Sequence, residues 1–132
     1  MAETAQPLAD LTEISTQVQV AVVLDREGSV LAATVDDERA GRLAASALEL
    51  FRAGDERSEQ ELVQLDATLP DGSVFVVRDG DRLIAATTTP EPTVGLVFYD
   101  LKSALRGFGE EQKPKRAPAK PTSTRKKKDA SA

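Results

Sequence analysis

The sequence predicts an α+β domain with a five-stranded, mainly antiparallel sheet flanked by three helices. Two observations carry this prediction. A hairpin pattern occurs twice, as VVLDREGSVLAAT at 22–34 and VVRDGDRLIAAT at 76–87, and each copy is an apolar run, a charged turn with a glycine and a second apolar run. Each hairpin then leads into a segment with apolar residues at helical spacing. A hairpin with one apolar face needs a cover, and each helix supplies one.

The first half of the chain supplies one short helix and the first hairpin. Residues 7–16 place leucines at helical spacing, which predicts a helix. Residues 18–24 are rich in valine, and the end of the segment is apolar at successive positions, as expected for an inner strand covered on both faces. The turn at 25–28 contains a glycine available for positive φ, and 29–35 is the partner strand.

Residues 36–52 form the clearest helix. Three acids, Asp36, Asp37 and Glu38, stand at its start, where the helix dipole favours them, and Gly54 is a plausible stop. The apolar positions span an arc of about 160°, wider than one sheet-packing stripe requires, and Gly41 and Ala45 extend it with small side chains. The arc consists of Ala40, Leu43, Ala44, Ala47, Leu48, Leu50 and Phe51.

Three strands follow the long helix as a meander. Residues 61–69 alternate, with Val63, Leu65, Ala67 and Leu69 on one face, which is the half-buried pattern of a peripheral strand. The turn Pro70-Asp71-Gly72 leads into a strand at 74–78, and Asp79-Gly80-Asp81 turns again into a strand at 83–88.

The last helix is predicted to open at Thr89-Pro90-Glu91-Pro92, because proline suits a first helical turn. Tyr99 is expected to pack beside its apolar face, and Gly107 and Gly109 to close it. One apolar stripe runs along it through Val94, Val97, Phe98, Leu101, Leu105 and Phe108.

The charge divides the chain into a domain at 1–108 and a basic tail at 109–132. The tail has eight bases and three acids, so it carries +5 of a total of −5, and the rest carries −10. Its apolar side chains are alanines interrupted by prolines, so we expect it to be disordered. Its bases are Lys113, Lys115, Arg116, Lys120, Arg125, Lys126, Lys127 and Lys128.

Several chemistries have no residues to support them. The chain has no histidine or cysteine and no phosphate-binding or dinucleotide-binding glycine motif, so we expect no enzyme activity, metal or cofactor. The acids at 36–38 and 55–56 are better explained as a helix start and a solvated loop than as cation ligands. Arg26, Arg78 and Arg82 could contact a phosphate, but solubilising turn residues are the commoner case.

The sequence carries no targeting signal that we recognise. The N-terminus is acidic and lacks the apolar core of a signal peptide, and no apolar run approaches the length of a membrane span. The absence of cysteine fits a reducing compartment, so we expect a cytoplasmic protein.

The ordered pattern resembles the Roadblock family, the dynein-light-chain-like regulators that partner small Ras-like GTPases. The resemblance covers about Leu8 to Phe108. It rests on AVVLDREGSVLAAT after a short first helix, on the alanine-rich RLAASALELF, and on DGDRLIAATTTPEPTVGLVFYDL, where a glycine opens the final helix. Profilin-like and longin-like domains share part of this layout.

The resemblance implies a homodimer in which the second helix and third strand pair across two subunits and extend the sheet. It also implies action on a small Ras-like GTPase without a catalytic arginine, either as a regulator of GTP hydrolysis or as a scaffold. The expected dimer contacts are Ala40, Gly41, Leu43, Ala44, Ala47, Leu48, Phe51, Val63 and Leu65. The expected rim contacts with the GTPase are Arg39, Arg42, Glu49 and Arg52.

The basic tail leaves a second function open. Up to eight bases could neutralise phosphates and give sequence-independent nucleic-acid binding, although the acidic body opposes it and no aromatic residue of the tail could stack on bases. The clusters KPKR and RKKK could equally serve as an import-like signal or contact an anionic membrane. A tail that only solubilises the protein is the remaining alternative.

Overall fold

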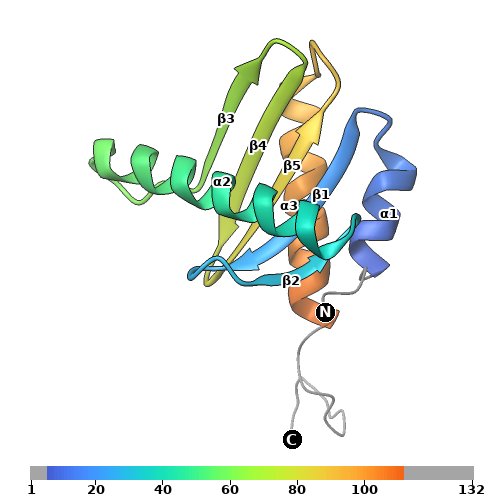
Figure 1. Ribbon diagram of the computed structural model, residues 1–132, viewed down its shortest axis with the longest axis horizontal. Coiled ribbons are helices and arrows are strands. Elements are labelled where there is room, and N and C mark those ends of the chain that lie inside the picture. Colours follow the sequence, from blue (N-terminus) through green and yellow to red (C-terminus); the bar gives the residue numbers. More distant parts are fainter. Residues whose placement is uncertain (1–5, 112–132) are drawn as a thin grey trace, which may run out of the picture.

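The structure is a computed structural model that describes residues 6–111 (Figure 1). Its elements follow the predicted order, which confirms the α+β class with three helices and one five-stranded antiparallel sheet. They are α1 (Gln6–Ile14), β1 (Val18–Asp25), β2 (Val30–Ala33), α2 (Asp37–Arg57), β3 (Gln64–Leu69), β4 (Gly72–Asp79), β5 (Arg82–Thr88) and α3 (Val94–Glu111).

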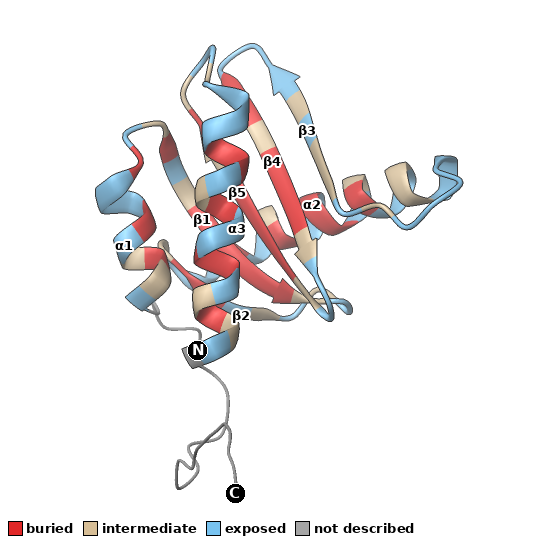
Figure 2. Cartoon of the chain, turned by 180° about the vertical axis from the view of Figure 1, so that it is seen from behind, coloured by how far each residue is buried: buried red, intermediate tan, exposed pale blue. Residues whose placement is uncertain are grey.

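The sheet has the strand order β2-β1-β5-β4-β3. Every neighbouring pair is antiparallel, and the two hairpins meet at the centre, where β1 pairs with β5 from Val18↔Thr88 to Asp25↔Arg82. The helix α2 crosses one face of the sheet, and α1 and α3 lie together on the other (Figures 1 and 2). The strands β2 and β3 are therefore the two sheet edges.

The two glycine turns of the repeated hairpins form as predicted. In the first, the Asp25 Oδ1 atom accepts hydrogen bonds from the backbone N–H groups of Glu27 and Ser29 at 3.0 and 2.9 Å, and Gly28 has a φ of 96°. In the second, Gly80 has a φ of 64°. Left-handed backbone of this kind is accessible to glycine at little cost, so each turn glycine has a local structural reason.

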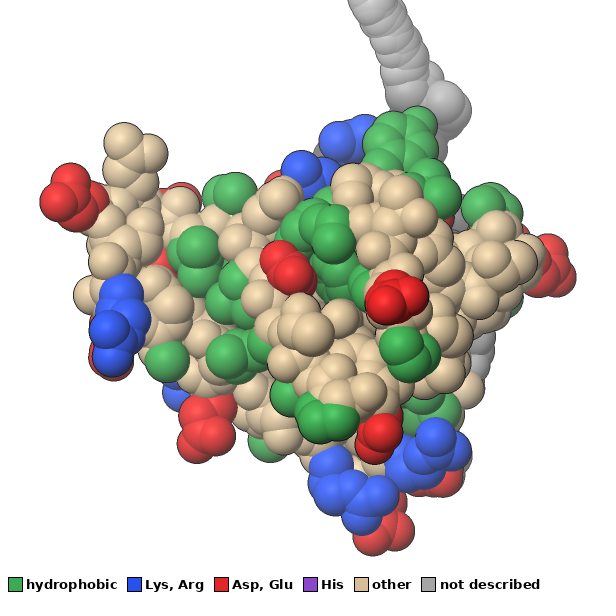
Figure 3. Space-filling view, turned by 90° about the horizontal axis from the view of Figure 1, so that it is seen from above, with side chains coloured by type: hydrophobic (Ala, Val, Ile, Leu, Met, Phe, Trp, Pro, Cys, Tyr) green, Lys and Arg blue, Asp and Glu red, His purple; other side chains and the backbone are tan. Residues whose placement is uncertain are grey.

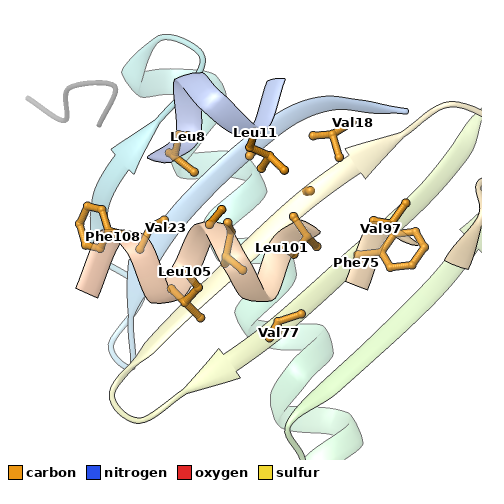
Figure 4. Close-up of a cluster of buried hydrophobic side chains, with 14 of the residues drawn as sticks. Leu8, Leu11, Val18, Val23, Phe75, Val77, Val97, Leu101, Leu105 and Phe108 are labelled. Atoms are coloured by element: carbon orange, nitrogen blue, oxygen red, sulfur yellow. The ribbon is translucent and has the colours of Figure 1, made fainter. Parts of the chain in front are cut away.

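One layer of the core lies between the sheet and the pair α1 and α3. The rings of Phe75 and Phe98 meet edge to face with centroids 4.9 Å apart. A Cβ atom at Gly107 would lie 3.4 Å from the Cγ atom of Pro7, so the two helices approach closely there. Figure 4 shows side chains of α1, α3 and the sheet converging in this layer. Its larger members are Leu8, Leu11, Val18, Val23, Phe75, Val77, Ile84, Val97, Phe98, Leu101, Leu105 and Phe108.

The other layer lies between the opposite sheet face and α2. It is built from smaller side chains, because α2 presents three alanines to the strands. Its members are Val22, Leu24, Ala33, Ala40, Ala44, Ala47, Leu48, Phe51, Val76, Leu83 and Ala85.

The helix α2 is longer than the sequence predicts, because Gly54 does not stop it. The helix continues to Arg57 and ends where the Ser58 backbone becomes extended, with the Ser58 N–H donating to the Asp55 carbonyl at 3.2 Å. Asp55 therefore belongs to the helix and not to a loop. The following strand begins later than expected, at Gln64 rather than residue 61.

The helix α3 begins later and ends later than predicted. The expected first turn is a loop, because Glu91 has a φ of 57°, which is incompatible with a right-handed helix. The first helical hydrogen bond runs from the Val97 N–H to the Thr93 carbonyl at 3.0 Å. Gly107 and Gly109 do not close the helix, which continues to Glu111. Tyr99, expected to pack beside the apolar face, is instead 68% exposed.

The predicted ends of the remaining elements are nearly right. The first helix is Gln6–Ile14 rather than 7–16, and the second strand is Val30–Ala33 rather than 29–35. The strands β4 and β5 begin one or two residues earlier than predicted. The predictions for residues 112–132 lie outside the described residues.

Candidate protein-interaction surface

The N-terminus of α2 is capped by a side chain. The Asp36 Oδ1 atom accepts a hydrogen bond from the Arg39 N–H at 2.9 Å, and Asp37 and Glu38 add negative charge to the first turn. The sequence predicted this role for the three acids. Arg42 pairs with Glu38 at 3.1 Å, but both side chains are well exposed, so this ion pair contributes little to stability.

Five of the nine residues predicted to form a subunit interface lie in the core of the single chain. They are Ala40, Ala44, Ala47, Leu48 and Phe51, none more than 9% exposed. They pack against the sheet and offer a partner almost no surface. The wide apolar arc of α2 is thus explained by intramolecular packing, and it does not by itself require a second subunit.

The remaining predicted contacts divide between two sides of α2. Leu43 and Leu65 are half-buried, and Val63 is 54% exposed, all on the side of β3. Gly41 is exposed, and a Cβ atom placed on it would meet nothing within 4 Å. Ala45, which is not one of the nine but was expected to extend the apolar face beside Gly41, is exposed on the opposite side of the helix and lines a shallow pocket with Gly28.

Incompletely covered apolar side chains gather where α2 passes β3 and β4. We call this set the α2–β3 strip; all its members pack against the α2 core layer but remain half-buried. Leu69, at the end of β3, is 52% exposed. Figure 3, which looks onto the end of the molecule where β3 and β4 join, shows hydrophobic side chains reaching the surface between acidic ones. The strip consists of Leu43, Leu62, Leu65 and Val74.

Gly54 shapes this strip. A Cβ atom at Gly54 would lie 3.0 Å from the Cδ2 atom of Leu62 and 3.3 Å from that of Leu65. A methyl group here would require the two leucine side chains to shift by a few tenths of an ångström, so the glycine allows their present close packing against the helix. The Leu62 N–H donates to Asp55 Oδ1 at 3.0 Å and ties the connection to the same turn of α2.

The strand β3 borders the strip and has one strand neighbour, β4, in the described sheet. It pairs with β4 from Gln64↔Val77 to Leu69↔Gly72, and its other side is open. The C-terminal end of α2 extends past β3 beyond the outline of the sheet (Figure 1). An open strand edge beside uncovered apolar surface is the usual setting for pairing with another chain.

The four predicted rim residues, Arg39, Arg42, Glu49 and Arg52, are all exposed on α2. Arg52 is turned towards the β1–β2 hairpin, since its Nη2 atom donates to the Arg26 carbonyl at 3.2 Å. The exposed positions of Arg39, Arg42 and Glu49 do not single out any of them as a partner contact.

The three turn arginines do not form one group. Arg82 stacks over the Phe108 ring at 5.5 Å, on the α3 face. Arg26 lies 4.0 Å from Glu61 and 3.8 Å from Asp81, on the α2 face. The Arg82 guanidinium therefore has a packing role, whereas the long, exposed ion pairs of Arg26 contribute little to stability.

Arg78 was expected to be a solvated turn residue, and that expectation is wrong. Its side chain is 7% exposed and lies over the Phe51 ring at 5.3 Å. Its Nη2 atom is 2.9 Å from Glu61 Oε2, in an ion pair whose direction does not make a hydrogen bond. The alternation of the strand could have predicted this burial. Residues two apart share a face, so Arg78 lies with Val74 and Val76 on the face of β4 that α2 covers.

The described residues contain no group of three or more acidic, histidine or cysteine side chains that could hold a metal ion. No helix among residues 6–111 has the length and apolarity needed to cross a bilayer. The eight basic residues of the predicted tail lie outside the part of the chain that the structure describes.

These features define a three-helix, five-stranded α+β domain with an open sheet edge beside an apolar strip. The family profile of the Roadblock/LC7 domain matches residues 5–89. The chain belongs to the Roadblock/LC7 family. No curated protein matches the sequence.

Solved structures with the same fold include a Roadblock/LC7 domain from Streptomyces avermitilis, with a TM-score of 0.75 at 18% identity over 83% of this chain and 98% of that one. MglB of Myxococcus xanthus matches with a TM-score of 0.60 at 17% identity, covering 80% of this chain and 86% of MglB. A structure described as MglB with tetrameric arrangement matches with a TM-score of 0.57 at 16% identity, covering 83% and 93%. These likenesses confirm the predicted Roadblock-like fold.

The two faces of α2 predict a large effect at one position and a small effect at the next for the same substitution. Ala44→Glu places an unpaired charge in the core and should lower the free energy of unfolding by about 3–5 kcal/mol. Ala45→Glu, one residue further on the exposed face, should change it by less than about 0.5 kcal/mol. Urea denaturation followed by circular dichroism measures both, and equal losses would show that α2 does not pack on the sheet as described.

Proposed function

We propose that this chain forms a two-fold homodimer through β3 and the neighbouring side of α2, and that the dimer binds a small Ras-like GTPase as a non-enzymatic regulator or scaffold. The observation that carries the proposal is the position of the α2–β3 strip beside the open edge of β3. Antiparallel pairing of two β3 strands would continue the sheet into a second subunit and cover both strips at once.

The interface proposed now differs in detail from the one expected from sequence. The side chains available for it are Leu43, Leu65 and Val63, together with Leu69 and Leu50. Leu50 is half-buried and lies two helical turns after Leu43, on the same side of α2. A specific dimer of this kind buries on the order of 1,200–2,000 Å². The buried alanines contribute by keeping α2 close to the sheet.

Membership of the Roadblock/LC7 family supports the choice of partner, since the resemblance implies action on Ras-like GTPases. The structural likeness to MglB supports it only through the shared fold. The exposed polar face of α2, with Arg39, Arg42 and Glu49, is the surface we assign to the GTPase.

The mechanism that fits this surface is preferential binding of one nucleotide state. A partner can bias a two-state switch only if it binds the two forms unequally. Arg78 and Arg82 are engaged with Phe51 and Phe108, so neither is presented as a catalytic arginine. Any stimulation of hydrolysis would come from shaping the switch regions of the GTPase.

Dimerisation predicts a shift in molecular mass on changing one exposed side chain. Val63→Lys should convert the dimer to monomer without unfolding it, because the position is already half exposed but lies at the proposed interface. Multi-angle light scattering at micromolar concentration measures the mass. The matched control is Leu96→Lys, a similarly exposed apolar residue on α3, which should remain dimeric. A monomeric unmodified chain, or equal behaviour of the two variants, would contradict the interface.

GTPase binding predicts a nucleotide preference. A small Ras-like GTPase recovered by pull-down from native lysate should bind the purified dimer at least tenfold better in one nucleotide state, about 1.4 kcal/mol. Arg42→Glu on α2 should weaken this binding, and Lys102→Glu on α3 should not. Any single arginine-to-alanine change should alter the hydrolysis rate far less than the roughly 10³-fold loss typical of an arginine finger.

Two outcomes of the pull-down and binding measurements would contradict regulation of a GTPase. Recovery of nucleic acid in place of a GTPase would support the alternative role of the basic residues at 113–128. Equal binding of both nucleotide states by purified GTPases would leave a scaffold and exclude regulation.

A further inference from the structure

A groove of about 340 Å³ runs between α1 and α3 on the side away from the sheet. Ile14 of α1 and Tyr99 of α3 line it and are 72% and 68% exposed, which is unusual for large apolar side chains so close together. Gly107 and Pro7, where the two helices touch, mark its other end. This groove is on the opposite sheet face from the α2–β3 strip, as Figure 2 shows for the helices that form it.

The charged side chains that line the groove are both acidic. Asp10 lies on α1 and Asp100 on α3. Asp10 accepts a hydrogen bond from the Gln6 side chain at 2.8 Å, an exposed contact that a cation could replace. The groove therefore combines an aromatic ring and an aliphatic side chain with two carboxylates. A ligand matching it would carry both apolar rings and positive charge.

The chain itself contains such a segment. Residues 112–121 read QKPKRAPAKP and hold three prolines, four bases and no acid. The segment follows directly on α3, whose last residue is Glu111. Its composition predicts no fold of its own, and an extended proline-rich segment needs none to lie in a groove.

The segment is long enough to reach the exposed ring. From Glu111 back to Tyr99 is twelve residues of α3, about 18 Å of helix. Chain in the polyproline conformation covers about 3 Å per residue, so roughly six residues span that distance and the others make the reversal. Being in the same chain, the segment has an effective concentration on the order of millimolar, which allows a weak contact to be well populated.

We propose that residues 112–121 bind back into the α1–α3 groove of their own chain, with prolines against Tyr99 and Ile14 and bases paired with Asp10 and Asp100. Proline rings pack on aromatic faces at low entropic cost because the polyproline backbone is already restricted. The segment would then cover the groove and hold the remaining basic residues, 125–128, beside the acidic domain. This inference does not depend on the GTPase proposal.

The chain has no cysteine, so a nitroxide label can be attached to a single introduced cysteine. Ala119→Cys labelled with a nitroxide on the full chain should broaden the amide signals of Tyr99 and Ser103 so that they lose most of their intensity. Amide signals of α2 should be unaffected. The matched control is a label at Ser131→Cys, beyond the docking segment, which should give little effect on α3.

Substitutions in the groove test whether residues 112–121 bind it specifically or only lie near it. Asp10→Asn together with Asp100→Asn, both exposed or half-buried and conservative in shape, should restore the lost intensity severalfold, and so should raised salt. Tyrosine fluorescence gives a second readout, since Tyr99 is the only tyrosine and there is no tryptophan. Its quenching by acrylamide should increase in the double variant and remain unchanged in Leu96→Ala, which lies outside the groove.

Three results would overturn the proposal. The first is a label at position 119 that broadens no signal of α1 or α3. The second is broadening that persists in the double variant at the same strength. The third is broadening seen only when labelled chain is mixed with isotope-enriched unlabelled chain, which would mean that the segment binds a second copy.

Discussion

The sheet has two apolar faces, and three helices are available to cover them. Two helices therefore cover one face and a single helix covers the other, and the rest of the structure depends on this difference. Two helices, α1 and α3, close one face with leucines and the Phe75–Phe98 pair. One helix, α2, must cover the other, and it does so by lying close to the strands on alanines. With 21 residues, α2 is about 31 Å long and crosses the sheet to beyond β3, but one helix covers only a band about 10–12 Å wide along the strands, so apolar side chains of that face beside β3 stay partly uncovered.

The incomplete cover of the sheet beside β3 is the basis of the interface that we propose. The α2–β3 strip stays half-buried because no further element of the described chain reaches it, and it lies beside the one strand edge that α2 overhangs. In the homodimer that we propose, a second copy of the same surface would supply the missing cover, since both the apolar strip and the strand edge can pair with themselves about a two-fold axis.

Sequence patterns predicted the order of all eight elements and both glycine turns, because period-two and helical spacing are local signals. They failed where a long-range contact decides the outcome. Gly54 was predicted to stop a helix, but the helix continues past it to Arg57, and Leu62 and Leu65 pack closely against it. Glu91 adopts a left-handed conformation that no local pattern announced.

The site was predicted less well than the fold. The apolar arc of α2 was correctly identified, but whether such an arc faces its own sheet or a partner depends on the distance between helix and sheet. The arc alone carries no information about that distance. Arg78 was misplaced for a related reason, since its burial depends on Phe51 and Glu61, which are distant in sequence.

The central claim is that the open edge of β3 is closed by a second subunit. Hydrogen–deuterium exchange at each β3 amide tests it most directly. The amides of Gln64–Leu69 that do not bond to β4 should exchange as slowly as those of β4 at micromolar protein concentration, and should become fast in Val63→Lys. Fast exchange of those amides in a chain that light scattering shows to be dimeric would place the subunit contact elsewhere and contradict the account.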